Sequence, residues 1–174
     1  MATGYVDPNG DIAKGWDHPA SGAHYTKVDD GIRQPTQPGT ATKIACDESD
    51  GAVDTFAMET IPDVAEVTQV KVWVNGKHAG GGSDASVNIY IGGWKTAGDL
   101  GFTGSQSWKS RIFNGSWTQA QLDGLRVKLT SSVEEEGEIT VYEVYAEITY
   151  EEEAGGEART ATLNPLGLRR FGGF

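Results

Sequence analysis

The sequence predicts an all-β fold: an antiparallel β-sandwich of jelly-roll type with an extended C-terminal arm. The first observation is a series of short runs in which apolar and polar residues alternate, the pattern of strands that turn one face toward a core. The second is the spacing of these runs by turns, to which the 24 glycines and 6 prolines of the 174-residue chain contribute. The third is that no long run with helical period lies between them. Long connections between the strands favour a jelly roll among the sandwich types.

Residues 1–24 show no sustained apolar period, and we interpret them as an extended N-terminal segment. Trp16 is expected to anchor this segment by covering an open end of the core. Residues 7–11, Asp-Pro-Asn-Gly-Asp, form a turn that matches the first half of a calcium-binding loop. Ile12 stands where an EF-hand needs glycine, and His18 stands where it needs glutamate. We therefore expect no bound cation in this segment.

The β-sandwich domain is expected at residues 25–150. Its first six strand candidates are residues 24–33, 40–46, 53–60, 66–77, 85–94 and 107–114. The glycine-rich residues 76–86 are expected to form a flexible hairpin tip between the fourth and fifth strands. The residues expected to face the core from these two strands are Val70, Val72, Val74, Val87, Ile89 and Ile91.

The stretch from Trp117 to Tyr150 has the clearest local signals of the chain. Thr118 and Gln121 have the spacing of a capping box, which predicts one helical turn with Leu122 as its apolar contact. Two alternating runs follow, residues 125–130 and 139–150, separated by a charged turn. We expect these two runs to form an antiparallel hairpin with one apolar face.

Charge and composition exclude several classes of function. The net charge of −11 argues against free nucleic acid as a partner, because phosphate binding needs clustered Lys and Arg. No apolar run is long enough to predict a membrane span, and the first residues lack the pattern of a signal peptide. No His or Cys pair has metal-ligand spacing, no nucleophile motif is present, and Cys46 has no second cysteine with which to pair. We expect no enzymatic activity and no cofactor.

The end of the chain differs in charge from the body. Residues 151–158 have the composition of an acidic linker, and residues 159–174 are both apolar and basic. The segment 158–174 carries three arginines and no acid, so the segment 1–157 carries a net charge of −14. A basic and apolar end of this kind is expected to dock on a partner rather than to remain free. The residues expected to make that contact are Leu166, Leu168, Arg169, Arg170, Phe171 and Phe174.

Aromatic residues on the outward faces of the strands form a second candidate surface. Trp73, Tyr90 and Trp94, with Trp108 and Tyr145, have the residue types of a platform on which sugars stack. Aromatic residues in such positions also serve as a second layer of the sandwich or as an interface between copies. The sequence leaves these alternatives open.

Residues near both ends of the body resemble a recurrent pattern in tailed-bacteriophage structural proteins. The matching residues are Tyr5-Val6, Pro8, Gly10-Asp11-Ile12, Gly15-Trp16, a strand expected near Tyr25, Trp117-Thr118, Leu122, Gly124-Leu125, Val127, Glu143-Val144-Tyr145, Glu147-Ile148 and Tyr150. The resemblance covers residues 5–150 and is similar to the small jelly-roll proteins of phage heads and tails. It implies a fold and a virion context rather than a catalytic role.

Within that context, the resemblance suggests a capsid decoration (cement) protein. Such a protein would be made in the host cytoplasm, would reside in the virion, and would form homo-oligomers. Its partners would be other copies of itself or the major capsid protein, held through the C-terminal arm. Two alternatives stay open: a glycan- or receptor-binding module of a phage tail fibre, and a polymer-forming subunit that exchanges arms between copies.

Overall fold

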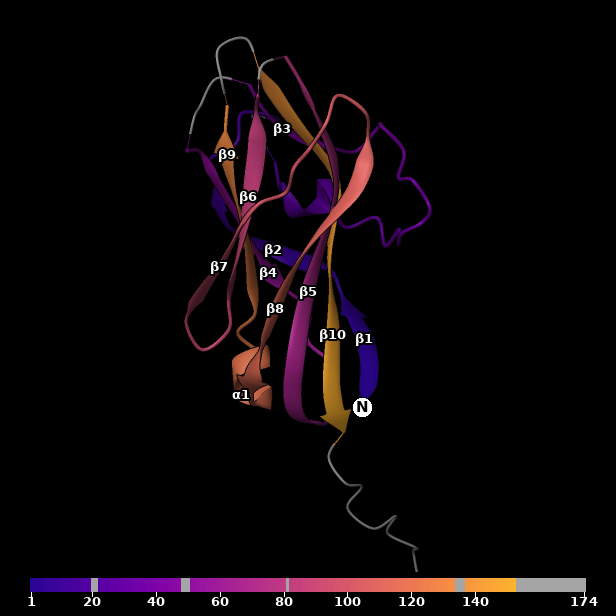
Figure 1. Ribbon diagram of the computed structural model, residues 1–174, viewed down its shortest axis with the longest axis vertical. Helices are drawn as coiled ribbons and strands as arrows, with labels where there is room; N and C mark the ends of the chain where they lie inside the picture. The colour runs from indigo at the N-terminus through magenta and orange to yellow at the C-terminus, as the bar shows by residue number, and fades with distance from the viewer. Residues whose placement is uncertain (20–21, 48–50, 81, 134–136, 153–174) are drawn as a thin grey trace, which may run out of the picture.

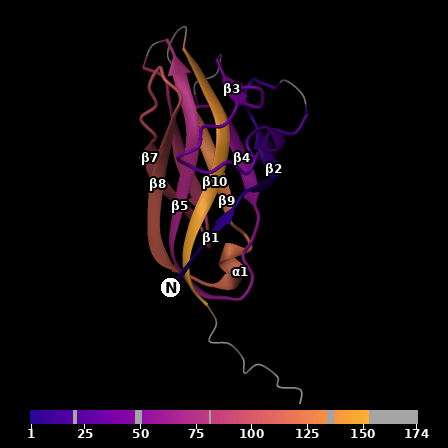
Figure 2. The same cartoon turned by 90° about the vertical axis from the view of Figure 1, so that its right-hand side faces the viewer.

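The computed structural model describes residues 1–19, 22–47, 51–80, 82–133 and 137–152. Its strands form two antiparallel sheets that pack face to face (Figure 1 and Figure 2). The elements in chain order are β1 (Ala2–Val6), β2 (Pro8–Lys14), the short 3-10 helix η1 (Tyr25–Lys27), β3 (Ile44–Cys46), β4 (Val53–Met58), β5 (Val64–Ala79), β6 (Asp84–Tyr90), β7 (Trp94–Asp99), β8 (Ser107–Trp117), α1 (Gln119–Leu122), β9 (Arg126–Ser132) and β10 (Glu138–Glu152). The expected antiparallel β-sandwich is confirmed.

The order of the strands is that of a jelly roll. Sheet A has the order β1-β10-β5-β8, with β3 also paired to β10, and sheet B has the order β2-β4-β9-β6-β7. Among the strands that the structure describes, every connection between consecutive strands crosses from one sheet to the other, except the β6–β7 hairpin. This crossing pattern closes two sheets around one core.

The core lies between the sheets and is filled by the alternating apolar residues of the central strands. Val70, Val72 and Val74 of β5 are fully buried, as are Val87 and Ile89 of β6, and Ile91 directly after it is 1% exposed. The expected inward direction of these six residues is therefore confirmed. Burying each such side chain stabilises the fold by about 1.5–3 kcal/mol.

Two expected hairpins are wrong. Strands β9 and β10 belong to different sheets, so their apolar faces meet across the core instead of lying side by side. Strands β5 and β6 also belong to different sheets, so the hairpin expected there is wrong; residues 76–79 are the end of β5 and residues 84–86 the start of β6. A period of two determines which face of a strand is apolar, but it carries no information on which strand becomes its neighbour.

The N-terminal residues contribute one strand to each sheet, although the sequence predicted only an extended segment over residues 1–24. Strand β1 pairs with β10, with Ala2 opposite Tyr150, and β2 pairs with β4. Trp16 is 4% exposed, as expected of an anchor on the core. The strand expected at residues 24–33 is wrong, because the structure has η1 and a loop there.

One end of the sandwich gathers the start of β1, the end of β10 and helix α1 (Figure 1). The predicted capping box is present: the Gln121 side-chain oxygen accepts the backbone N–H of Thr118 at 2.9 Å, and Leu122 is fully buried. Glu151 and Glu152, expected in the acidic linker, are the last residues of β10. The rest of the linker and the whole arm lie outside the described residues.

Candidate ligand-binding face

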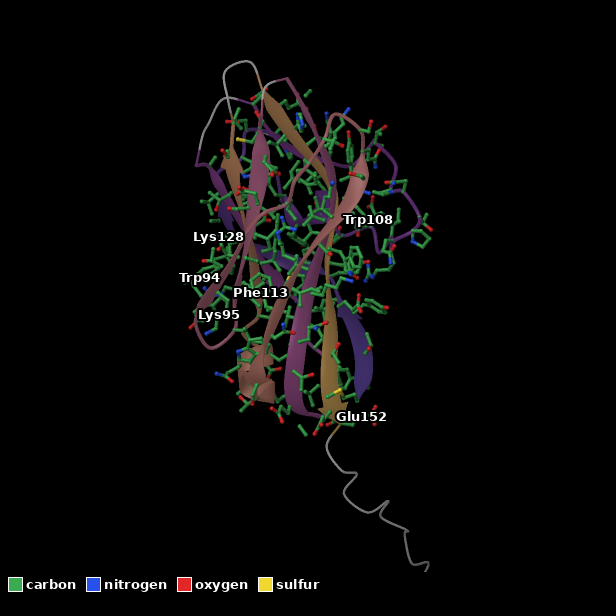
Figure 3. The ribbon with its side chains drawn as sticks, viewed as in Figure 1. Trp94, Lys95, Trp108, Phe113, Lys128 and Glu152 are labelled. Carbon is green, nitrogen blue, oxygen red and sulfur yellow. The ribbon has the colours of Figure 1, made fainter. Side chains whose placement is uncertain are left out.

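The structure does not bring the three predicted aromatic residues together. Trp73 lies on β5 in sheet A, whereas Tyr90 ends β6 and Trp94 begins β7 in sheet B. The two outer faces of the sandwich therefore each carry their own aromatic residues. Figure 3 shows Trp94, Lys95 and Lys128 on the β7 side of the molecule and Trp108 on the opposite side.

The aromatic cluster on sheet A surrounds Tyr145. The rings of Trp73, Trp108 and Tyr5 lie 6.2, 5.4 and 6.0 Å from the Tyr145 ring, which is 1% exposed. The Trp73 indole N–H donates to Glu147 at 2.8 Å, and the Trp108 indole N–H donates to the carbonyl of Thr36 at 2.8 Å. Because Tyr145 is enclosed and both indole N–H groups are bonded, the centre of this cluster serves packing, while Tyr5 at its edge is 52% exposed.

Residues 28–43, here called the covering loop, lie over that cluster. The Arg33 guanidinium sits 4.4 Å from the centre of the Tyr145 ring and donates to the Asp7 carboxylate at 2.6 Å. The loop also covers Glu143, which is fully buried and accepts the backbone N–H of Gly31 at 3.2 Å. The sequence predicted that Glu143 and Tyr145 point outward from β10; they do, but the loop buries them.

Burial and charge shift two pKa values in this cluster. Burial, followed by the Asp30 and Asp7 carboxylates, raises the pKa of Glu143 to about 8, against the lowering effect of Arg33. Burial also raises the pKa of Tyr145 to about 12. Glu143 is thus a neutral carboxylic acid near pH 7.

The outer face of sheet B is different, because its aromatic residues are open. Tyr90 and Trp94 are directly opposite each other on β6 and β7, with ring centres 5.5 Å apart in an edge-on arrangement. The Trp94 side chain is 48% exposed. An exposed tryptophan held by a cross-strand partner is a preformed contact surface for a ligand.

Two cations on the neighbouring strand β9 lie over these rings. Arg126 is opposite Tyr90, and its guanidinium carbon is 5.2 Å from the centre of that ring. Lys128 is opposite Asn88, and its ammonium nitrogen is 4.6 Å from the Trp94 ring. Neither cation forms an ion pair with any residue that the structure describes.

Asn88 lies two residues before Tyr90, which ends β6. Its side chain alternates with the core residues Val87 and Ile89, so it points to the same side of the sheet as Tyr90. Asn88 is only 8% exposed, so it lies beneath this surface and is not open to a ligand. We call Tyr90, Trp94, Arg126 and Lys128 the basic–aromatic face.

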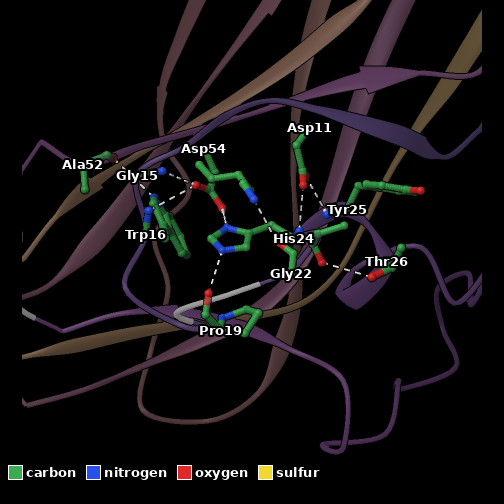
Figure 4. A network of polar contacts seen from close by, with 12 residues as sticks. Asp11, Gly15, Trp16, Pro19, Gly22, His24, Tyr25, Thr26, Ala52 and Asp54 are labelled. Atoms are coloured by element: carbon green, nitrogen blue, oxygen red, sulfur yellow. Dashed lines mark hydrogen bonds and ion pairs between the residues drawn. The ribbon is translucent and has the colours of Figure 1, made fainter.

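A buried polar network on the inner side of sheet B was not predicted (Figure 4). His24 Nδ1 lies 2.5 Å from the Asp54 carboxylate, and His24 Nε2 lies 2.9 Å from the carbonyl of Pro19. Both ring nitrogens face acceptors, so the ring satisfies both only when each nitrogen carries a proton. Asp54 also accepts the backbone N–H groups of Gly15 and Trp16, at 2.8 and 3.1 Å.

This network fastens the segment after β2 to β4. His24 and Asp54 are 3% and 0% exposed, which keeps them from a ligand in solvent. No signal in the sequence links two residues 30 positions apart, whose types are common in surface turns. We therefore assign the network to the fold.

The described residues contain no group of three or more His, Cys, Asp or Glu side chains placed to hold a metal ion. Within the same ranges, no helix has the length and apolarity to cross a membrane. The predicted contact residues of the arm, Leu166, Leu168, Arg169, Arg170, Phe171 and Phe174, lie outside the described residues. Their role stays a prediction.

No protein-family model and no curated protein sequence matches this chain. Among solved structures, CBM35 from Cellvibrio japonicus Abf62 matches with a TM-score of 0.46 and 14% identity, over 83% of this chain and 92% of that one. A carbohydrate-binding module of family 29 matches with a TM-score of 0.43 and 9% identity, over 84% of this chain and 90% of that one.

A family two carbohydrate esterase from Cellvibrio japonicus matches with a TM-score of 0.39 and 10% identity. The match covers 87% of this chain but only 34% of the esterase. At such TM-scores and identities, these likenesses carry no information about the ligand or activity of this chain.

Proposed function

We propose that this chain is a non-enzymatic component of a tailed-bacteriophage virion whose body binds a glycan through the basic–aromatic face. The observation that carries the binding role is Trp94, half exposed and held edge-on against Tyr90 on an open sheet face. The virion context rests on the resemblance of residues 5–150. The buried positions of Val6, Trp16 and Trp117 agree with the architectural role of the matching residues.

Binding at this face needs no chemical step. The apolar side of a sugar ring would pack on the exposed part of the Trp94 indole, which loses little conformational freedom because Tyr90 already holds it. The N–H groups of Arg126 and Lys128 would donate hydrogen bonds to sugar hydroxyls. Such a site recognises shape and hydroxyl pattern and leaves the ligand unchanged.

The test is a glycan array followed by titration of the best ligand with the wild type and two variants. Trp94→Ala should weaken binding at least tenfold, because it removes the aromatic contact. Ile112→Ala is the matched control, since Ile112 is 50% exposed on β8 of the other sheet. Absence of any glycan ligand, or equal affinity of the Trp94→Ala variant, would refute the binding role.

A capsid decoration role through the arm is the second candidate, and the charge distribution favours it. The segment 158–174 carries three arginines and no acid, and the remainder of the chain has a net charge of −14. Strand β10 ends at Glu152, at the end of the sandwich where β1 begins. Arg and Phe are residue types that dominate interface contacts.

This candidate predicts that the arm holds the protein on a capsid protein or on another copy of itself. Alanine at Arg169, Arg170, Phe171 and Phe174 should remove the protein from particles while the body stays folded; unchanged occupancy contradicts the role. Light scattering of the full chain and of a chain ending at Glu153, at two salt concentrations, separates the two partners. A larger species that depends on the arm and weakens with salt indicates docking between copies, as a polymer-forming subunit would require.

A further inference from the structure

The basic–aromatic face carries two cations that form no ion pair with the described residues. Arg126 and Lys128 lack carboxylate partners within the described residues, in a chain whose net charge is −11. Acidic residues of the two strands that flank β9 are already engaged: Asp54 on β4 with His24, and Asp84 on β6 with the backbone N–H groups of Gly101 and Phe102. Asp99 on β7 is exposed opposite Ser86, and it forms no ion pair with either cation.

The spacing of the two cations suits a chain-like ligand. Arg126 and Lys128 are two residues apart on β9, so both point outward, about 7 Å from each other along the strand. Arg126 lies over Tyr90 of the adjacent strand β6, and Lys128 lies over Trp94 of β7, one strand further away. Stacking on Tyr90 leaves the edge of the guanidinium, with its N–H groups, free to form paired hydrogen bonds to a carboxylate.

We propose that the ligand of this face is a glycan that carries carboxylate groups, as uronic acids do; this inference rests on the proposed glycan-binding role. Arg126 binds one carboxylate through its guanidinium fork, and Lys128 attracts a second as a point charge. Trp94 contacts the sugar rings between the charges.

The test uses oligogalacturonate and its methyl ester, which has the same sugar skeleton without the charge. The wild type should bind the acid at least tenfold more tightly than the ester, and affinity should fall as salt is raised. Arg126→Gln and Lys128→Gln should each weaken binding of the acid about fivefold or more, with unchanged melting temperatures. Lys71→Gln is the matched control, because Lys71 also lies over a tryptophan ring, at 3.9 Å from Trp73, but on sheet A.

The outcomes separate this inference from the role on which it rests. Equal binding of acid and ester overturns the acidic ligand but leaves glycan binding in place. No binding of either probe, together with an empty glycan array, overturns both. If dextran sulfate binds as tightly as oligogalacturonate, and Trp94→Ala does not change its affinity, the face attracts polyanions unspecifically. That result overturns the inference. Self-association of the protein that Lys128→Gln abolishes would also overturn the inference, because the face would then bind an acidic surface of another copy and not a glycan.

Discussion

Glu143 should make the protein less stable as the pH rises through the neutral range, and Glu143→Gln should remove this loss. The side chain is fully buried under the covering loop, and its Oε2 has no hydrogen-bond partner among the described residues. Burial, followed by the carboxylates of Asp30 and Asp7, raises the pKa from 4.5 to about 8, although Arg33 acts in the opposite direction. The folded state therefore favours the neutral acid.

The direction in which stability changes with pH follows from the number of protons that Glu143 binds in the folded and the unfolded state. Between pH 4.5 and 8, the folded protein keeps a proton on Glu143 that the unfolded chain has released. The free energy of unfolding therefore falls with pH over this range, from its full value below pH 4.5 to its lowest value at about pH 8. Each pH unit costs about 1.4 kcal/mol, so the whole loss amounts to about 4–5 kcal/mol.

The assay is urea unfolding of the wild type, Glu143→Gln and Glu151→Gln from pH 5 to pH 9. Glutamine stays neutral and can still accept the N–H of Gly31, so this variant should match the wild type near pH 5 within about 1 kcal/mol. At pH 8.5 it should be more stable than the wild type by about 3 kcal/mol or more. Glu151 is exposed at the end of the same strand, and its variant should follow the wild type. If the free energies of unfolding of Glu143→Gln and the wild type change in the same way with pH, the reasoning is refuted.

Two further predictions concern the fold. His24→Gln should lower the free energy of unfolding by about 3 kcal/mol, because it removes the His24 Nδ1 contact of the buried Asp54 carboxylate. His18→Gln, in an exposed pair with Asp47, should cost no more than about 0.5 kcal/mol, and equal losses in urea unfolding would contradict the assignment. Gly76→Ala should destabilise by about 2–3 kcal/mol, because a Cβ would approach Phe102 to 2.6 Å, whereas Gly104→Ala meets nothing within 4 Å and should be neutral in thermal unfolding.

The two faces of the sandwich show what could not be predicted about the site. Trp73 and Tyr90 are on β5 and β6, whose core residues were predicted correctly, and Trp94 begins β7; Trp73 nevertheless lies on the opposite face from Tyr90 and Trp94. The pairing of Tyr90 with Trp94 follows from the β6–β7 hairpin, whereas Arg126 reaches Tyr90 only through the pairing of β6 with β9. Positions far apart in sequence become neighbours through long-range strand pairing, which local periodicity does not encode.

The sequence patterns also did not predict which aromatic side chains are exposed. Tyr145 and Trp94 are both aromatic residues on outward positions, but one is 1% exposed and the other 48%. The difference arises because residues 28–43 lie over sheet A, with Arg33 against Tyr145. The sequence predicted a strand at 24–33, so a loop across this face was not expected.

The sequence by itself determined the fold class, the core residues of the central strands and the capping box of α1, because each depends on local periodicity or on a short fixed spacing. It also determined the charge contrast between the body and the segment 158–174. Only the tertiary structure decided the strand order, the placement of β1 and β2, and which aromatic residues stay open. These features depend on contacts between segments that are far apart in the sequence, so no single stretch of the chain predicts them.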